Sequence, residues 1–279
     1  MQKWREYWFA PSSLLDLGVG RAWLALVLLL LDGTSRFQIV GRASPELWTP
    51  VGLVAALGWE QPSPTAMQFL GWTTSALLVL AAVGLFTRTA LTLLVPLLLV
   101  QEGMLASVGK PTHAGLPAMW AVMFFALAPC SRRFAIDAWL RPSAMEKSRF
   151  ARWPIDLFYV VLASFYFSAG LSKLLWSGLS WADGSTLQYH LLAKGTSPGL
   201  RLAEFPWLCT LGSTTVLLWE LSFPLGMIRR LRPFFLLAGA AFHLSTGLFL
   251  DVWFWPVVAL YLLFVPWHRH GERIDALHT

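Results

Sequence analysis

Lys173 is the residue whose type and position suggest chemistry most directly. It lies near the end of an apolar stretch, residues 155–174, that is about as long as one bilayer span. Trp176 and Trp181 follow as typical interfacial anchors, among turn-forming residues that the hydrocarbon region would exclude. A lysine at such a boundary either extends to water or turns inward, where desolvation favours the neutral amine that can act as a base. Its position alone favours the solvated lysine.

Other ionisable residues lie in apolar surroundings and could share a pocket with Lys173. They are Glu102, Glu220 and His243, with His113 in a short loop between spans. Ionisable residues within membrane helices mark functional sites by default, so these residues predict a polar pocket. The alternatives stay open: a loop histidine is often solvated, and Glu220 or His243 can simply join two helices by a hydrogen bond.

Composition predicts an all-α polytopic membrane protein. Hydrophobic residues make up 56% of the 279 residues, charged residues 13%, and mean hydropathy is +0.58. At about twenty residues a span, the chain has room for about eight transmembrane helices in a bundle, which is one membrane domain over residues 1–279. Cys130 and Cys209 belong to no ligand cluster, so no metal site is predicted. The net charge of +6 lies in short loops beside apolar stretches, which argues against nucleic acid as a partner.

The expected elements follow from hydropathy. Residues 1–9 resemble an amphipathic helix on the membrane surface, and the loop 32–65 is expected to hold one interfacial helix near residues 51–58. Asp16 and Arg21 begin the first span and are expected to neutralise each other in part. Glu220 and His243 are expected to point into the bundle and to pair. The spans are predicted at residues 14–31, 66–86, 90–108, 114–128, 155–174, 207–228, 234–250 and 252–265.

The distribution of basic residues predicts the orientation. Of the 21 lysines and arginines, fourteen fall in loops on the side of the termini, five on the other side, and Arg21 and Lys173 within spans. Because cytoplasmic loops carry the excess of positive charge, both termini are expected in the cytoplasm. His113, Trp181 and the end of the Lys173 helix would then meet at the outer face.

Familiar enzyme motifs are absent: the sequence has no nucleotide-binding loop, no HExxH and no GxSxG. The stretch YFSAGLSKLLWSGLSWADG, residues 166–184, nevertheless resembles the corresponding stretch of vitamin K-dependent gamma-glutamyl carboxylases and of bacterial proteins that share their membrane region, the HTTM-domain proteins. Three other features resemble the family in the same order: GLFTR at residues 84–88, His113, and Phe242 with His243.

The resemblance implies quinol chemistry. The carboxylase lysine that matches Lys173 is the base that deprotonates vitamin K hydroquinone, and oxygen then converts the quinol anion to a strong base that drives glutamate carboxylation. The resemblance thus implies a lyase or monooxygenase with a reduced quinone as cofactor, with Lys173 and His113 as catalytic residues. Glu102, Trp181, Glu220 and His243 are the expected pocket residues. A lipid quinone and a peptide or protein substrate are the expected partners, in a bacterial-type cytoplasmic membrane.

The sequence departs from the carboxylase pattern at two positions. Thr112 stands where the family has asparagine, and Ser172 where it has a second lysine. The large lumenal domain of the carboxylases has no counterpart before Thr279, so a smaller task with a lipid-soluble substrate is expected rather than glutamate carboxylation. Two other classes stay open: a non-catalytic maturation or immunity partner of a secreted peptide, and a small-solute transporter, although no repeat symmetry supports the latter.

Overall fold

The protein is helical almost throughout, as its composition predicts. The computed structural model describes residues 2–32, 37–109, 115–141 and 149–269. These residues form two compact units, one within Met1–Phe158 and Ala259–Thr279 and the other within Tyr159–Val258. The only strands in the described ranges are β1 (Pro11–Ser13) and β2 (Arg149–Ala151), which pair antiparallel with Pro11 opposite Ala151.

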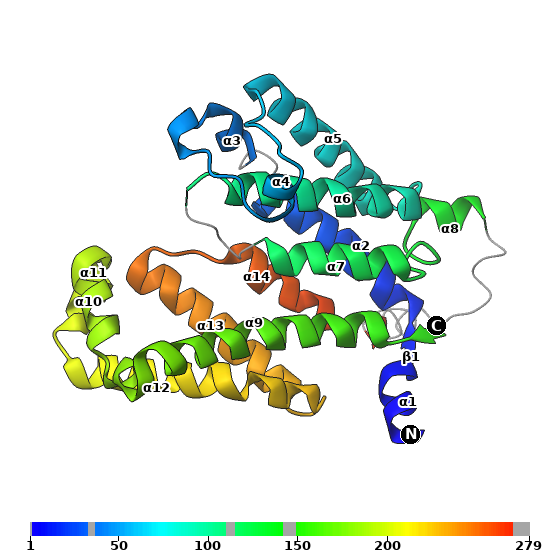
Figure 1. Cartoon of the computed structure of the whole chain (residues 1–279). Coiled ribbons are helices and arrows are strands. Elements are labelled where there is room, and N and C mark those ends of the chain that lie inside the picture. The colour runs from blue at the N-terminus through cyan, green and yellow to red at the C-terminus, as the bar shows by residue number, and fades with distance from the viewer. Residues whose placement is uncertain (1, 33–36, 110–114, 142–148, 270–279) are drawn as a thin grey trace. The chain divides into compact units, whose positions relative to one another are not determined.

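Unit 1 holds the first helices of the chain (Figure 1). They are α1 (Gln2–Phe9), α2 (Leu14–Val27), α3 (Gln38–Arg42), α4 (Gly52–Ala56), α5 (Pro64–Val83), α6 (Thr87–Ala106), α7 (Leu116–Leu127) and α8 (Ile136–Leu140). A π-helical turn, Leu28–Asp32, extends α2, and Pro45–Leu47 is a 3-10 turn. α2, α5, α6 and α7 pack side by side. The short helix α4 confirms that a helix forms near residues 51–58, α3 was not expected, and the position of α4 at the membrane surface stays a prediction.

The turn between α5 and α6 contains the GLFTR sequence and is held by hydrogen bonds to the side chain of Asp137. Gly84 has a φ of 75°, and any Cβ there would overlap Ala135 and Arg21, so only glycine fits. Phe86 and Thr87 leave backbone N–H groups unpaired at the start of α6, and both donate to Asp137 of α8, at 2.9 and 2.8 Å. The GLFTR sequence therefore has a structural role, in which Asp137 caps a helix that lacks a cap of its own.

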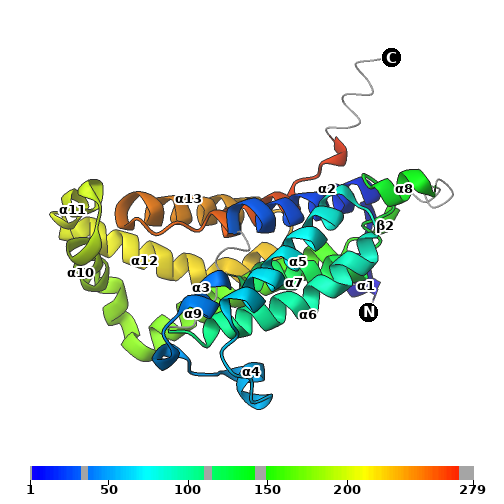
Figure 2. The same ribbon diagram turned by 90° about the horizontal axis from the view of Figure 1, so that it is seen from above.

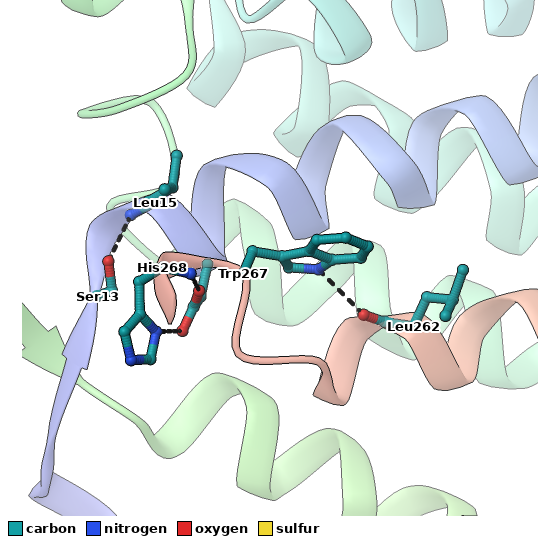
Figure 3. Close-up of polar contacts among 6 residues, drawn as sticks. Ser13, Leu15, Leu262, Trp267 and His268 are labelled. Atoms are coloured by element: carbon teal, nitrogen blue, oxygen red, sulfur yellow. Dashed lines mark hydrogen bonds and ion pairs between the residues drawn. The ribbon is translucent and has the colours of Figure 1, made fainter. Parts of the chain in front are cut away.

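The expected pairing of Asp16 with Arg21 is wrong. Arg21 is fully buried and donates to the backbone carbonyls of Gly18 and Phe134. Asp16 instead accepts hydrogen bonds from the backbone N–H of His268 at 2.8 Å and pairs with its Nδ1 at 2.7 Å. Figure 3 shows His268 at the start of α2, beside the cap that Ser13 provides to the N–H of Leu15. Residues five apart on a helix point about 140° apart, which explains why the two did not meet.

Unit 2 is built on three long helices. α9 (Trp153–Ser177) begins in unit 1 and continues in unit 2; the others are α12 (Pro206–Ser222) and α13 (Arg232–Leu250). A 3-10 segment, Gly178–Asp183, leads from α9 to the shorter α10 (Ser185–Lys194) and α11 (Ser197–Ala203), which lie together at one end of unit 2 (Figure 2). The 3-10 turn Phe223–Met227 follows α12. The helix α14 (Trp255–Leu260) begins in unit 2 and ends in unit 1, which also holds the turn Tyr261–Phe264. Sequence analysis assigned no element to α10 and α11.

Among the residues that the structure describes, five helical segments are long and apolar enough to cross a membrane. They are Pro64–Val83, Thr87–Ala106, Trp153–Asp183, Pro206–Met227 and Arg232–Leu250. The chain is therefore a multi-pass membrane protein. The other three predicted spans coincide with helices that are shorter, namely α2, α7 and α14 with its following turn. The count of eight spans stays a prediction.

Candidate functional site

Lys173 forms an ion pair with Glu220 within unit 2. Its Nζ lies 2.7 Å from both carboxylate oxygens, and the Glu220 side chain is only 4% exposed against 24% for Lys173. Charged hydrogen bonds of this length are the strong ones, and each charge makes the burial of the other less costly. Lys173 is therefore not simply a solvated lysine at the membrane boundary.

Helical periodicity explains why these two residues face each other. On α9, Tyr159, Leu162, Tyr166 and Gly170 are buried and recur every three to four residues in line with Lys173. On α12, Cys209, Ser213 and Leu217 form the corresponding buried stripe that ends at Glu220. Tyr166 contacts Trp219 and Phe223, and Gly170 lies against Glu220, so the buried side of α9 meets the C-terminal end of α12. The ion pair forms where the two stripes end.

Trp181 covers Lys173 from the 3-10 segment. Its ring centroid lies 5.0 Å from Nζ, a cation–π distance. The segment that carries Trp181 is tied to α12, because Thr214 donates to the carbonyl of Ala182 at 3.0 Å and Thr210 to that of Asp183 at 2.5 Å. The tryptophan is thus held in place by backbone hydrogen bonds as well as by its own contacts.

A cavity of about 410 Å³ opens beside Lys173 in unit 2. Its volume lies in the range of small-molecule sites. Lys173 and Trp181 line it, whereas Glu220 and His243 do not. The walls are mostly apolar and include Leu187, Leu191, Leu202, Leu208, Val216, Phe242, Phe249 and Leu250. Such a cavity suits an apolar ring or chain that carries a polar group at one point.

The polar residues of this cavity other than Lys173 and Trp181 were not predicted from the sequence; they are Thr186, His190, Ser213, Ser245 and Thr246. Ser213 is 1% exposed, and its hydroxyl has no hydrogen-bond partner among the described residues. His190 comes from α10, which was not predicted as a helix. The available signals were Thr196 followed by Pro198, which predict a helix start at α11, and Leu187 with Leu191, whose spacing indicates an apolar helix face on α10.

His243 belongs to an aromatic cluster and does not pair with Glu220 as expected. Its Nε2 lies 2.7 Å from the hydroxyl of Tyr166, which is itself in ring contact with Trp219 and Phe223. Glu220 and His243 are both buried, at 3% and 6% exposed, as polar residues in apolar helices should be. Their predicted pairing is wrong because each has a closer partner on α9.

Two of the predicted site residues, Glu102 and His113, are not among the described residues of unit 2. Glu102 lies in unit 1, on α6, where it is 8% exposed. His113 lies outside the described residues. Of the residues predicted for the site, Lys173 is thus in contact with both Trp181 and Glu220, and His243 lies in the same unit.

Comparison with known proteins agrees with the motifs of the Lys173 stretch. The model of the HTTM domain family matches residues 10–268, which is most of the chain. No curated protein and no solved structure matches this chain. The matched range includes every residue that lines the cavity, as well as Lys173 and Glu220. Because the match covers most of the sequence, the chain belongs to the HTTM domain family.

Proposed function

We propose that this protein is a quinol-dependent membrane enzyme in which Lys173 takes part in deprotonating a lipid-soluble hydroquinone. The observation that carries the proposal is the position of Lys173: it lines an apolar cavity of ring-compatible size and is bound by a buried carboxylate. A quinone of the vitamin K type fits this chemistry, because its fused ring and tail are apolar and its two oxygens are the only polar groups.

The contacts of Lys173 leave it able to bind a ligand. An ammonium group carries three N–H donors, and Lys173 directs its two hydrogen bonds within the described structure to Glu220. A quinol oxygen in the cavity can accept the third. Trp181, whose ring centroid lies 5.0 Å from Nζ, also lines the cavity and can contact a ligand ring there.

The proposed reaction begins with loss of a proton from one quinol hydroxyl. The O–H bond breaks, the proton passes to Lys173 in its neutral amine form, and the electron pair stays on the quinol oxygen. The Lys173 ammonium formed in this way stabilises the quinol anion. In the carboxylases that the sequence resembles, this anion reacts with oxygen, and the product drives carboxylation of a glutamyl side chain. A peptide or another lipid-soluble molecule is the proposed acceptor here.

Formation of the quinol anion tests the proposal directly. Purified protein in lipid nanodiscs is titrated with menadiol without oxygen, and binding and the anion are followed by tryptophan quenching and by absorbance. Lys173→Met should purify like the parent but form no anion, because methionine keeps the length and loses the amine. Lys173→Arg should also fail, because a guanidinium does not release its proton at neutral pH.

The matched control is Lys194→Met, which removes a lysine at the end of α10 that does not line the cavity. It should behave as the parent. If Lys173→Arg forms the anion at the parent level, Lys173 is not needed for proton transfer. If the parent protein binds no quinol, the ion pair is better explained as a non-catalytic link between α9 and α12.

A further inference from the structure

We infer that Glu220 is the final acceptor of the substrate proton and that Lys173 relays the proton to it. This inference rests on the proposed function. It assigns to Glu220 a positioning and proton-accepting role that acts through Lys173, since the carboxylate does not line the cavity while Nζ does.

The order of the groups in space supports a relay. Glu220 is 4% exposed and lies behind Lys173 as seen from the cavity, with both of its oxygens 2.7 Å from Nζ. A ligand in the cavity can reach Nζ directly but can reach the carboxylate only through it. Hydrogen-bond distances of this kind allow proton transfer between neighbouring groups.

Because Lys173 and Glu220 form a charged pair, Lys173 must give up one of its own protons before it can accept the proton of the substrate. In contact with two carboxylate oxygens, Lys173 is stabilised as an ammonium, and an ammonium cannot accept another proton. It must first pass one of its protons to Glu220, which breaks one N–H bond and forms an O–H bond. The neutral amine can then take the proton of the quinol hydroxyl.

The overall transfer keeps the charge of the site constant. Before transfer, the site holds an ammonium, a carboxylate and a neutral quinol; afterwards it holds an ammonium, a neutral carboxylic acid and a quinol anion. The negative charge has moved from one side of Lys173 to the other. No net charge is created in apolar surroundings, where an uncompensated charge would be costly. His190, the other ionisable group that lines the cavity, is not needed as an acceptor.

Two measurements test the relay. The first is the infrared difference spectrum of the parent with and without menadiol, recorded without oxygen, in which a band of a protonated carboxyl group should appear together with the quinol anion. Isotope-labelled glutamate should shift this band in the parent itself. Glu220→Asp, which keeps an acceptor, should move the band, and Glu220→Gln should remove it.

The second measurement is the pH profile of the bound anion. If the proton stays within the site, the fraction of bound quinol that is ionised should be flat across about pH 6 to 9, because nothing is exchanged with bulk water. In Glu220→Gln the profile should instead rise with pH, because Lys173 must lose its own proton to water before it can act. The anion at the acidic end should fall about tenfold or more.

The outcomes separate this inference from the proposed function. A parent that forms the bound anion with a rising pH profile and with no carboxyl band releases the proton to water, which overturns the relay and leaves the enzyme proposal standing. A parent that forms no bound anion at any pH overturns both. A flat profile in the parent with a glutamate carboxyl band supports both.

Discussion

Gly170 on α9 lies so close to Glu220 on α12 that a Cβ at position 170 would be 2.9 Å from the Cβ of Glu220. This close approach lies three residues before Lys173 and sets the separation of the two helices at the ion pair. We expect Gly170→Ala to push α12 away and to cost about 1 to 3 kcal/mol of stability, as overpacking typically does. It should also weaken quinol binding.

Thermal unfolding in detergent and the menadiol titration measure both effects. Ser168→Ala, on the exposed side of the same helix, is the matched control and should change neither. A Gly170→Ala protein that unfolds at the parent temperature would show that the helices have room for a methyl group.

Ser213 is expected to contribute to ligand binding more than to stability. Its hydroxyl is buried at the cavity and has no partner among the described residues, so Ser213→Ala removes no hydrogen bond from the ligand-free protein. If the hydroxyl bonds to a quinone oxygen, its loss should weaken binding by about 1 kcal/mol, or roughly fivefold. Titration of tryptophan fluorescence with menadione gives the dissociation constant.

Ser245→Ala is the control, since the hydroxyl of Ser245 also lies at the cavity but already donates to the carbonyl of Phe242 at 2.7 Å. Its binding constant should stay near that of the parent. Equal affinities of Ser213→Ala and the parent would remove Ser213 from the ligand site.

Asp137 is expected to make stability depend on pH in acid. Partial burial alone would raise the pKa of this carboxyl, but hydrogen bonds from Thr87 and Phe86 outweigh that effect and hold its pKa below the usual range. A lowered folded-state pKa means that the stabilisation is fully present above the unfolded-state value, about 3.9. It is lost as the pH falls through the lower folded-state value.

Asp137→Ala should therefore lower the unfolding temperature at neutral pH, in line with the loss of about 1 kcal/mol for a helix cap. The difference from the parent should shrink as the pH is lowered below about 4, because the parent loses its carboxylate there too. Glu60→Ala, at an exposed carboxylate outside the helices, is a control for the loss of a negative charge elsewhere. A difference that does not change with pH would contradict the charge-based cap.

The predicted orientation can be tested with reporter fusions. Alkaline phosphatase fused after Leu140 should be inactive, because that loop is basic and is expected in the cytoplasm. The same enzyme fused after Lys194 should be active. The opposite pair of results would invert the predicted topology, and two inactive fusions would change the number of spans between these residues.

The long helices and the buried faces of α9 and α12 could be predicted from the sequence, because apolar length and three-to-four-residue spacing are local properties. Lys173 continues the buried stripe of Tyr166 and Gly170, although its place at the end of the apolar stretch had favoured a solvated side chain. The family likewise follows from the sequence stretch around Lys173.

The partners within the site could not be predicted in this way. Glu220 was expected to pair with His243, whereas it pairs with Lys173 and His243 meets Tyr166. These choices depend on how each helix is rotated about its axis against its neighbours, which hydropathy does not specify. The helices α10 and α11 were missed because they are short and only partly apolar, so their contacts with the rest of unit 2 decide their structure.

The two residues of the ion pair enter the membrane at different times during synthesis. Lys173 leaves the ribosome 47 residues before Glu220, so α9 enters the membrane while its lysine has no carboxylate to meet. A lysine in the middle of a span would cost about 3 kcal/mol at that moment. Because Lys173 lies near the helix end, its side chain can extend into the headgroup layer and turn inward once α12 has been inserted. The site is thus completed late in translation, when the second half of the pair is inserted.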